Sequence, residues 1–451
     1  MRARARTDRF IVPLAAIAVL ALAVRLVETL VLRAGNKPDQ DAYYYWTQGH
    51  ALAVGEGFID AVRLSFLQGV YPSAYHPPLF GMFLAAVDWL GFDTVDSNRV
   101  ACCLLSVGSV ILIAYTARRI AGPRAGLIAA ILAAIYPPLW VSDAMLLSET
   151  MVIFVVAFTL LVTYRFRERP SIPFAIAMGV GTALCAMTRT ELILLFPIVV
   201  VPFVLSPRVG SWSRRLRMLG AAALTVVVLV GPWVGYNMSR FHHPEFIATG
   251  TGAALMSGSC HRVWYGSYIG YWTNCEQIPP KGGDESDDDV WYRQRSLDFW
   301  EHHVTRVPLV VAARVGRLWN VFKPVQQVHF TGGIEEQGDA TAWFSLAGYV
   351  ILMPLAIWGL FLLRRRGVAI LPLLALAGIV SLSAATTSGV QRYRTPADVA
   401  IVLSAAVAIE VALGRLVAKP SFAGLRRPWA FLAGPEPGPP PAAPEPEPAA
   451  V

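Results

Sequence analysis

The first apolar run of the chain, Phe10–Leu32, has the sequence FIVPLAAIAVLALAVRLVETLVL, and a polar and aromatic segment, Asp39–Trp46 or DQDAYYYW, follows it closely. As an α-helix, the run is long enough to cross a hydrocarbon core of about 30 Å. Carboxylates and aromatic rings therefore stand where the chain would leave the membrane. This order of residues predicts a membrane protein whose first loop carries polar and aromatic side chains.

The composition extends this prediction to the whole chain. Its 451 residues are 55% hydrophobic and 15% charged, and the mean hydropathy is +0.51. Soluble proteins carry about 25% charged residues, so we exclude a soluble enzyme with a large core. The net charge is +8, but the basic residues cluster in short linkers between apolar runs. This is the positive-inside distribution of a multi-pass membrane protein, and it indicates no nucleic-acid partner.

A cleaved signal peptide is the alternative for the first apolar run, because several arginines precede it. The run is too long for that reading, lacks a small-residue cleavage site, and carries Arg25 and Glu28. We therefore predict a retained first span with a cytoplasmic N-terminus. Arg25 and Glu28 lie one helical turn apart, and we expect them to pair with each other near the outer end.

The basic linkers set the orientation of the other spans. The short run 78–90 decides on which side of the membrane the later linkers lie, because a full crossing there would move the arginines at 118–124 to the outside. We therefore expect it to be re-entrant or non-spanning. All later arginine-rich linkers then fall on the cytoplasmic side. The prediction is an all-α integral membrane bundle of about ten transmembrane helices with outer-face loop helices, in the plasma (inner) membrane, with both termini cytoplasmic.

This topology divides the chain into five segments. They are a basic cytoplasmic N-terminus (1–9), an N-terminal transmembrane core (10–235) that contains the first outer loop (34–77), an extracytoplasmic region (236–341), C-terminal transmembrane helices (342–417) and a Pro/Ala/Glu tail (418–451). The composition of the tail predicts cytoplasmic disorder. Within the outer region, Val290–Phe322 has the pattern of an amphipathic helix on or near the membrane. The acidic run Asp284–Asp289 is interpreted as a solvated loop.

The cysteines divide by their surroundings. Cys102, Cys103 and Cys185 lie within apolar runs and are expected to be buried. Cys260 and Cys275 lie in the polar outer region, where an oxidising compartment would let them form a disulfide worth roughly 3 kcal/mol. The spacing of Cys and His residues matches no zinc motif.

Ionisable residues gather on one predicted face, in linkers otherwise nearly free of charge: Asp39, Asp41, His76, Glu149, Arg189, Glu191, Arg392 and Arg394. Charged residues at span ends also serve as interfacial anchors, but so many on one face indicate a site. A transferase with a lipid-carried, phosphate-activated donor needs cations for the phosphate and a carboxylate for the acceptor hydroxyl. The candidate phosphate ligands are His76, Arg189, Arg392 and Arg394.

The candidate general base is Asp41, with Asp39 as the second choice. The aromatic and acidic residues around them are candidate substrate contacts, namely Tyr44, Tyr45, Glu149 and Glu191. Carboxylates spaced as Asp39 and Asp41 also suit a divalent cation, so the sequence leaves a metal cofactor open.

These residues lie in an ordered set of short motifs. The set comprises Asp41-Ala-Tyr-Tyr-Tyr, Gly55-x-Gly57-Phe58, His76-Pro-Pro-Leu, Arg118-Arg119-x-x-Gly-Pro-Arg-Ala-Gly, Leu147-Ser148-Glu149, Thr188-Arg189-Thr-Glu191 and Arg392-Tyr393-Arg394-x-Pro396. In order and sidedness the set resembles the GT-C superfamily of polytopic glycosyltransferases, in the branch of bacterial relatives of protein O-mannosyltransferases and aminoarabinose transferases. The resemblance covers roughly residues 10–417.

The resemblance implies a hexosyl- or pentosyltransferase that uses a polyprenyl-phosphate sugar. It further implies an extracytoplasmic active site, an inverting single displacement, and a catalytic acid in the first outer loop, at Asp41 or else Asp39. The acceptor would be an extracytoplasmic glycan, lipid or protein. This chain differs from the family pattern at two positions that concern the donor. The Asp-Glu pair common in the mannosyl and aminoarabinosyl enzymes is replaced by Asp41-Ala42, and the basic residue that these enzymes have before Pro-Pro is replaced by His76.

Two other classes of function remain as alternatives. A transporter or flippase for a lipid-linked sugar would show internal hydropathy repeats and midplane charges, whereas this chain has its charges at one face and no evident repeat. A non-catalytic scaffold of the cell envelope would tolerate Asp41→Asn, and an enzyme would not.

Overall fold

The structure is a computed structural model that describes residues 2–60, 70–275, 278–280 and 282–417. The predicted disordered tail, 418–451, lies outside the described residues. The chain forms two compact units, Met1–Glu410 and Val411–Val451. The features that matter for function belong to the first unit.

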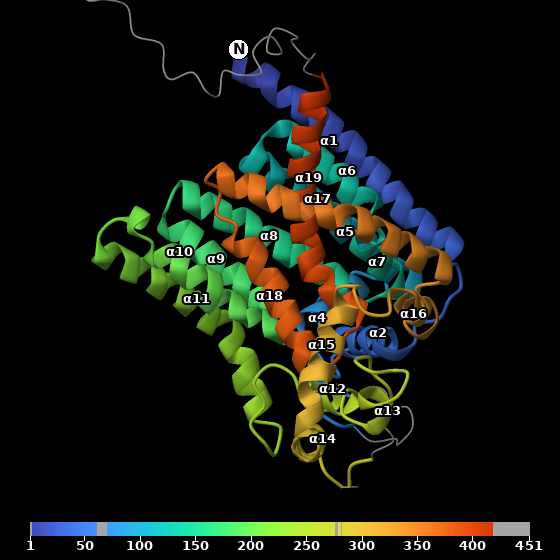
Figure 1. The fold of residues 1–451 in the computed structure, drawn as a ribbon. Helices are drawn as coiled ribbons and strands as arrows, with labels where there is room; N and C mark the ends of the chain where they lie inside the picture. Colours follow the sequence, from blue (N-terminus) through green and yellow to red (C-terminus); the bar gives the residue numbers. More distant parts are fainter. Residues whose placement is uncertain (1, 61–69, 276–277, 281, 418–451) are drawn as a thin grey trace, which may run out of the picture. The chain divides into compact units, whose positions relative to one another are not determined.

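The described residues form helices and no strands, apart from one isolated bridge between Ile59 and Pro72, which confirms the all-α class (Figure 1). The helices are α1 (Arg2–Val27), α2 (Gln40–Ala53), α4 (Leu79–Trp89), α5 (Val95–Ala121), α6 (Pro123–Ile135), α7 (Val141–Met145), α8 (Glu149–Glu168), α9 (Ile172–Ala186), α10 (Val201–Leu205), α11 (Trp212–Met238), α12 (Thr251–Ser257), α13 (His261–Trp264), α14 (Glu285–His302), α15 (Val307–Leu318), α16 (Pro324–His329), α17 (Asp339–Arg365), α18 (Leu371–Thr386) and α19 (Thr395–Val417).

Tighter and wider turns of helix join several of these elements. They are the π-helical turns η1 (Glu28–Leu32), η4 (Phe196–Val200) and η7 (Phe330–Ile334), and the 3₁₀ turns η2 (Pro137–Leu139), η3 (Thr190–Leu194), η5 (Pro207–Val209), η6 (Val304–Arg306) and η8 (Gln391–Arg394). Three of them, η3, η7 and η8, border the candidate site described below.

Six helical segments are long and apolar enough to cross a membrane: Phe10–Leu32, Val95–Ala121, Glu149–Glu168, Trp212–Met238, Asp339–Arg365 and Gln391–Arg415. Five shorter apolar helices accompany them, so the chain is a multi-pass membrane protein. The predicted number of about ten spans is not confirmed by length alone. Helix α4 has 11 residues and would span only about 16 Å, which agrees with the prediction that this run does not cross.

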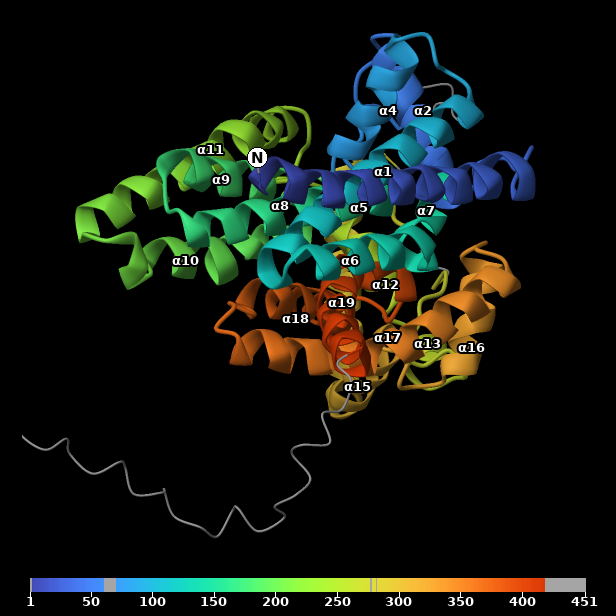
Figure 2. The same cartoon turned by 90° about the horizontal axis from the view of Figure 1, so that it is seen from above.

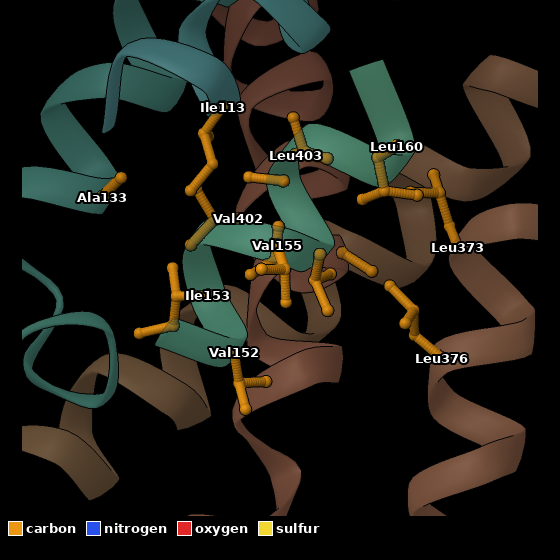
Figure 3. Close-up of a cluster of buried hydrophobic side chains, with 14 of the residues drawn as sticks. Ile113, Ala133, Val152, Ile153, Val155, Leu160, Leu373, Leu376, Val402 and Leu403 are labelled. Atoms are coloured by element: carbon orange, nitrogen blue, oxygen red, sulfur yellow. The ribbon is translucent and has the colours of Figure 1, made fainter. Parts of the chain in front are cut away.

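Helix α8 lies at the centre of the packing. Of its most apolar window, 78% is buried inside the protein, compared with 22% for α1 and for α11. Figure 3 shows Val152, Val155 and Leu160 of α8 among side chains from α5, α18 and α19. A helix surrounded by others needs apolar residues on every side, which explains why α8 has no polar stripe.

Helices α17 and α19 approach each other at Gly359. A Cβ atom placed on Gly359 would lie 1.8 Å from the backbone oxygen of Ser404, so only glycine fits there. Small residues allow close backbone contact between membrane helices, where van der Waals packing drives association. This contact holds the last two long helices together, one of which begins at the candidate site.

The pairing expected between Arg25 and Glu28 is wrong. The Arg25 guanidinium points into the bundle, where it lies 3.2 Å from the Asp143 carboxylate and donates to the Ser106 hydroxyl at 2.8 Å. Glu28 instead pairs with Arg33 at 2.8 Å, across the π-helical turn η1. The π-helical turn begins at Glu28, and the N–H of Arg33 donates to the backbone oxygen of Glu28 at 3.0 Å, so the wider turn brings Arg33 to Glu28. This change of helical register is not visible in residue spacing.

The acidic run Asp284–Asp289 is not a solvated loop, and this interpretation is corrected. Asp284 caps α14 through a capping box, because its carboxylate accepts the backbone N–H groups of Ser286 and Asp287. Acidic residues are favoured at the start of a helix, where the helix dipole is positive. Glu285 and Asp289 turn inward and are buried. The run is therefore a helix start that docks on the rest of the protein.

The segment Val290–Phe322 is helical as predicted, but it is interrupted. Helix α14 ends at His302, the 3₁₀ turn η6 follows, and α15 ends at Leu318. In Figure 1, α12, α13 and α14 gather at one end of the unit together with α2, away from the start of α1. Cys260 and Cys275 are joined by a disulfide within this region, with Cα atoms 5.9 Å apart.

The buried pair of Arg25 and Asp143 gives a first prediction. Replacing Arg25 with Met leaves the Asp143 carboxylate buried without a counter-charge, which costs about 3–5 kcal/mol. The double variant Arg25→Met/Asp143→Leu removes both charges and should recover most of that loss. Thermal melting in detergent measures both variants. A double variant no more stable than Arg25→Met would contradict the pairing.

Glu245 gives a second prediction. Its side chain is buried in the loop after α11, one carboxylate oxygen has no hydrogen-bond partner, and burial raises its pKa from 4.5 to about 7. The folded state therefore holds a proton more tightly than the unfolded state, so stability falls as the pH rises from about 4.5 to about 7. Melting temperatures across this range should fall less in Glu245→Gln, and equal pH dependence in both proteins would contradict the assignment.

Candidate active site

A cluster of charged side chains joins the first outer loop to the start of the last long helix. Asp41 lies in the first turn of α2, and one of its carboxylate oxygens accepts a hydrogen bond from the Arg392 guanidinium at 2.5 Å. The other carboxylate oxygen lies 3.5 Å from Nε2 of His76. The Nε of Arg392 lies 2.9 Å from Glu335, the residue after η7. Arg392 is thus held between two carboxylates from different parts of the chain.

The start of α2 explains where Asp41 points. The Asp39 side chain accepts the N–H of Gln40 at 2.7 Å and caps the helix, so Asp41 falls in the first turn beside the positive end of the helix dipole. Burial alone would raise the pKa of Asp41, but Arg392 and His76 outweigh it and hold the pKa well below its usual range. Asp41 is therefore ionised at every physiological pH.

A second charged group lies beside the first. Arg189, just before η3, is 2.9 Å from Glu191 and 3.3 Å from Glu149 at the start of α8. Its guanidinium stacks over the Tyr393 ring at 4.5 Å, and Arg392 lies 5.4 Å from the same ring. Tyr393 therefore stands between the two arginines and separates their charges.

Aromatic rings surround His76. The imidazole centroid lies 4.7 Å from that of Tyr45, 5.0 Å from that of Tyr44 and 4.9 Å from that of Tyr75. The rings fix the imidazole in place while its Nε2 faces Asp41. Because its neighbours are mostly apolar on three sides, a cationic His76 would need an anion on the remaining side.

The loop that carries His76 is held from the outer region by Glu285. The Glu285 carboxylate accepts hydrogen bonds from the Ser73 hydroxyl, the Ala74 N–H and the Thr249 hydroxyl, each at 2.7 Å. Tyr44 contacts the same Ser73 hydroxyl at 2.8 Å. Burial raises the pKa of Glu285, and these donors work against that shift. The start of α14 thus positions both α2 and the His76 loop.

Two cavities meet at the pair of Asp41 and Arg392. The larger cavity has a volume of about 620 Å³ and is lined by His76, Arg189, the polar end of α18 (383–388) and residues of α12. The smaller cavity has a volume of about 320 Å³ and is lined by the residues after η1 and after η7, with Arg99. Gln40, Asp41 and Arg392 line both cavities.

Most predicted site residues meet here. Asp41, Tyr45, His76, Glu149, Arg189, Glu191 and Arg392 all line the larger cavity. Asp39 lines only the smaller cavity, and Tyr44 lies behind His76 and lines neither. Arg394 is also outside both cavities. It is buried, pairs with Asp398 at 3.2 Å and donates to the backbone oxygen of Leu318 at 3.0 Å. Arg394 therefore braces α19 and does not face the cavities.

The aspartates of the first loop do not form a metal cluster with a third residue in the described structure. The cluster there whose ligand atoms all lie within 4.8 Å of one another is His242, Asp284 and Asp287. It lies on the surface at the start of α14, and its residues line neither cavity. Asp284 already serves as the helix cap, so these contacts are explained without an ion.

Several residues of the site receive no role in the sequence analysis. Glu335 holds Arg392 and lies in none of the motifs, and Tyr393, which stacks on Arg189, is named only as a position within a motif. Arg314 of α15 also contributes, because its guanidinium donates at 3.0 Å to the backbone oxygens of Ala385 and Thr386. These bonds hold the end of α18 where it lines the larger cavity. Tyr393 could have been identified from the sequence, because it lies between two arginines that were predicted to belong to the site.

Comparisons with known proteins give one family and one fold. Residues 75–236 match the family described as dolichyl-phosphate-mannose-protein mannosyltransferase. No curated protein matches the chain in sequence. The apo oligosaccharyltransferase of Archaeoglobus fulgidus is similar in structure, with a TM-score of 0.52 and 12% identity over 90% of this chain and 51% of that chain.

Two further solved structures are similar. AglB of Archaeoglobus fulgidus, an archaeal oligosaccharyltransferase in complex with an inhibitory peptide and a dolichol-phosphate, gives a TM-score of 0.52 and 14% identity over 89% of this chain and 50% of that chain. ArnT from Cupriavidus metallidurans bound to undecaprenyl phosphate gives a TM-score of 0.42 and 15% identity over 90% of this chain and 79% of that chain. The chain spans about half the length of the oligosaccharyltransferases.

The family match covers the His76 loop, Glu149 and Arg189, and the structural likeness extends over most of the chain. The family match includes the motifs at His76, Arg118, Glu149 and Arg189. The chain therefore has the fold of the GT-C superfamily of polytopic membrane glycosyltransferases.

Proposed function

We propose that this protein is a membrane glycosyltransferase that moves a sugar from a polyprenyl phosphate to an acceptor on the extracytoplasmic face. The observation that carries the proposal is the position of the Asp41–Arg392 pair, which lines both cavities at their junction. A transfer reaction needs two substrates that meet at one reacting group. A carboxylate that is always ionised stands where they would meet.

The larger cavity suits the donor. Arg189 and Arg392 supply the cations that a phosphate requires, and charge-assisted hydrogen bonds to arginine are the strongest available. His76 adds a ring nitrogen to the same lining. Leu194, Ile379 and Leu382 line the same cavity and offer apolar contacts to a lipid chain. The bound dolichol-phosphate in the structure of AglB, which has a similar fold, supports a lipid phosphate as ligand.

The smaller cavity suits the acceptor. Its lining is polar and mixes cations from Arg33, Lys37 and Arg99 with the carboxylates of Glu335 and Glu336. Such a lining fits a hydroxyl-rich or charged group better than a lipid chain, and it directs an acceptor hydroxyl toward Asp41.

The reaction that follows is a single displacement. The acceptor hydroxyl oxygen attacks the anomeric carbon, the bond from that carbon to the phosphate oxygen breaks, and the polyprenyl phosphate leaves. Binding of the donor phosphate to Arg392 would free Asp41 from that ion pair and raise its basicity, so Asp41 takes the hydroxyl proton as the new bond forms. Arg189, Arg392 and His76 stabilise the charge on the departing phosphate. Attack from the side opposite the phosphate inverts the anomeric configuration.

The positive-inside distribution supports the orientation. With the arginine-rich linkers in the cytoplasm, the end of the bundle that carries α2 and α12 to α14 faces outward, and both termini are cytoplasmic. A polyprenyl-phosphate donor on that side agrees with a cell-envelope acceptor.

The Asp41 carboxylate gives the third prediction. Asp41→Asn keeps the shape of the side chain but removes the base, so transfer by purified protein in nanodiscs should fall by about 100- to 10,000-fold. Asp39→Asn is the matched control. Asparagine caps a helix about as well as aspartate, so this variant should stay within about tenfold of wild type.

A panel of polyprenyl-phosphate monosaccharides serves as donors in that assay. Melting temperatures of both variants show that each remains folded. Turnover by Asp41→Asn equal to wild type would overturn the proposal, and movement of intact donor across the bilayer without sugar transfer would favour a flippase.

Separate donor and acceptor cavities give the fourth prediction. Arg189→Gln should raise the KM for the donor by about tenfold or more, because it removes a charge-assisted contact to the phosphate. Lys37→Gln is exposed at the smaller cavity and should raise the KM for the acceptor without changing that for the donor. Steady-state kinetics with each substrate varied in turn tests this split, and equal effects of both variants on both KM values would contradict it.

A further inference from the structure

A third cavity lies apart from the two at the candidate active site. It has a volume of about 410 Å³ and is formed by the end of α8, the segment from α10 through η5, and the turn between α17 and α18. In Figure 1 and in Figure 2 the α17–α18 turn lies near α10, at the side of the unit away from α14. None of its lining residues belongs to the other two cavities. We call it the basic cavity.

Arginines from three separate segments line the basic cavity: Arg167 of α8, Arg208 of η5 and Arg364 of α17. No carboxylate lines it. Within the described part of the chain, none of the three arginines forms an ion pair or a side-chain hydrogen bond, whereas their neighbours Arg119 and Arg366 pair with Glu168 and Glu410. The protein thus supplies acids next to the cavity but none inside it.

Helix dipoles explain only part of this arrangement. Arg167 and Arg364 lie in the last turns of their helices, where the negative end of the dipole favours a cation. Arg208 lies in η5, whose three residues are too few to give an appreciable dipole, and the dipoles do not require a cavity between the three side chains. Converging positive charges without acids stabilise a bound anion.

The rest of the lining is apolar. Phe203, Ile370 and Leu371 form the wall, and the Arg167 guanidinium lies 5.8 Å from the Phe203 ring. A free phosphate ion would match the arginines but leave this wall without a partner. A molecule with a phosphate and an adjoining hydrocarbon part satisfies both.

We propose that the basic cavity binds the headgroup of an anionic phospholipid from the leaflet at this end of the helices. The phosphodiester would accept hydrogen bonds from the three guanidinium groups, and the start of the acyl chains would lie along the apolar wall. Basic pockets between transmembrane helices on the cytoplasmic side are a known type of site for acidic lipids. The binding is non-covalent and independent of the proposed transfer reaction.

Titration of the purified full-length protein with phosphatidylglycerol tests the proposal. The protein is held in a neutral detergent, and the rise in melting temperature gives an apparent Kd; phosphatidylcholine, inorganic phosphate and glycerol phosphate are titrated in parallel. Wild type should respond to phosphatidylglycerol and not to the other three. Arg208→Gln/Arg364→Gln should bind phosphatidylglycerol about tenfold more weakly or worse, because two charge-assisted contacts are lost.

The control is Arg217→Gln/Arg365→Gln, which removes the same net charge from exposed arginines of the same region that do not line the cavity. It should bind phosphatidylglycerol as wild type does. Equal weakening in both double variants would overturn the proposal and leave general attraction between basic linkers and acidic lipid. An equal response of wild type to inorganic phosphate would also overturn it, as would phosphatidylglycerol binding seen only after removal of residues 418–451.

Discussion

The ion pair between Asp41 and Arg392 links the first outer loop to the beginning of the last long helix, 351 residues apart in the chain. Both cavities of the candidate site end at this pair, and the residues that hold each partner come from different elements. His76 flanks the carboxylate, and Glu335 and Tyr393 flank the guanidinium. Since two carboxylates share one arginine, displacement of Asp41 by a substrate leaves Arg392 still paired with Glu335. The buried charge of Arg392 therefore stays compensated when the pair opens.

The outer region takes part in this arrangement because polar side chains dock it onto the bundle. Glu285 binds the loop of His76, and Arg314 binds the backbone at the end of α18, so both walls of the larger cavity are held by α14 and α15. Each contact satisfies a buried charged group with several hydrogen bonds, which is the condition under which such a group is tolerated. The region between α11 and α17 is thus part of the site and more than a cover over it.

The grouping of the candidate site residues was inferred from sidedness and hydropathy. Asp41, His76, Arg189 and Arg392 come together because each follows or precedes an apolar helix at the same face, and that property is visible in the chain. The errors concern which way a side chain points. Arg394 lies two residues from Arg392, but within the short 3₁₀ turn its side chain faces Asp398. Arg25 and Glu28 have the spacing of partners, yet Arg25 pairs with Asp143, and the π-helical turn that begins at Glu28 brings Arg33 to Glu28 instead. Local backbone geometry and contacts between distant residues decide these cases, and residue spacing does not encode either.

The arginines of the candidate active site differ from those of the basic cavity in whether a carboxylate pairs with them. At the candidate active site, Arg189 and Arg392 both pair with carboxylates, so a phosphate there would compete with acids that are already in place. In the basic cavity Arg167, Arg208 and Arg364 have no acid partner among the described residues, so an anion meets no competitor. Transient binding suits the proposed transferase site, which would discharge a polyprenyl phosphate after each transfer. Persistent binding suits a lipid that stays with the protein and fills a gap between its helices. The same residue type thus fits two purposes, and the difference is set by whether the fold places a carboxylate beside it.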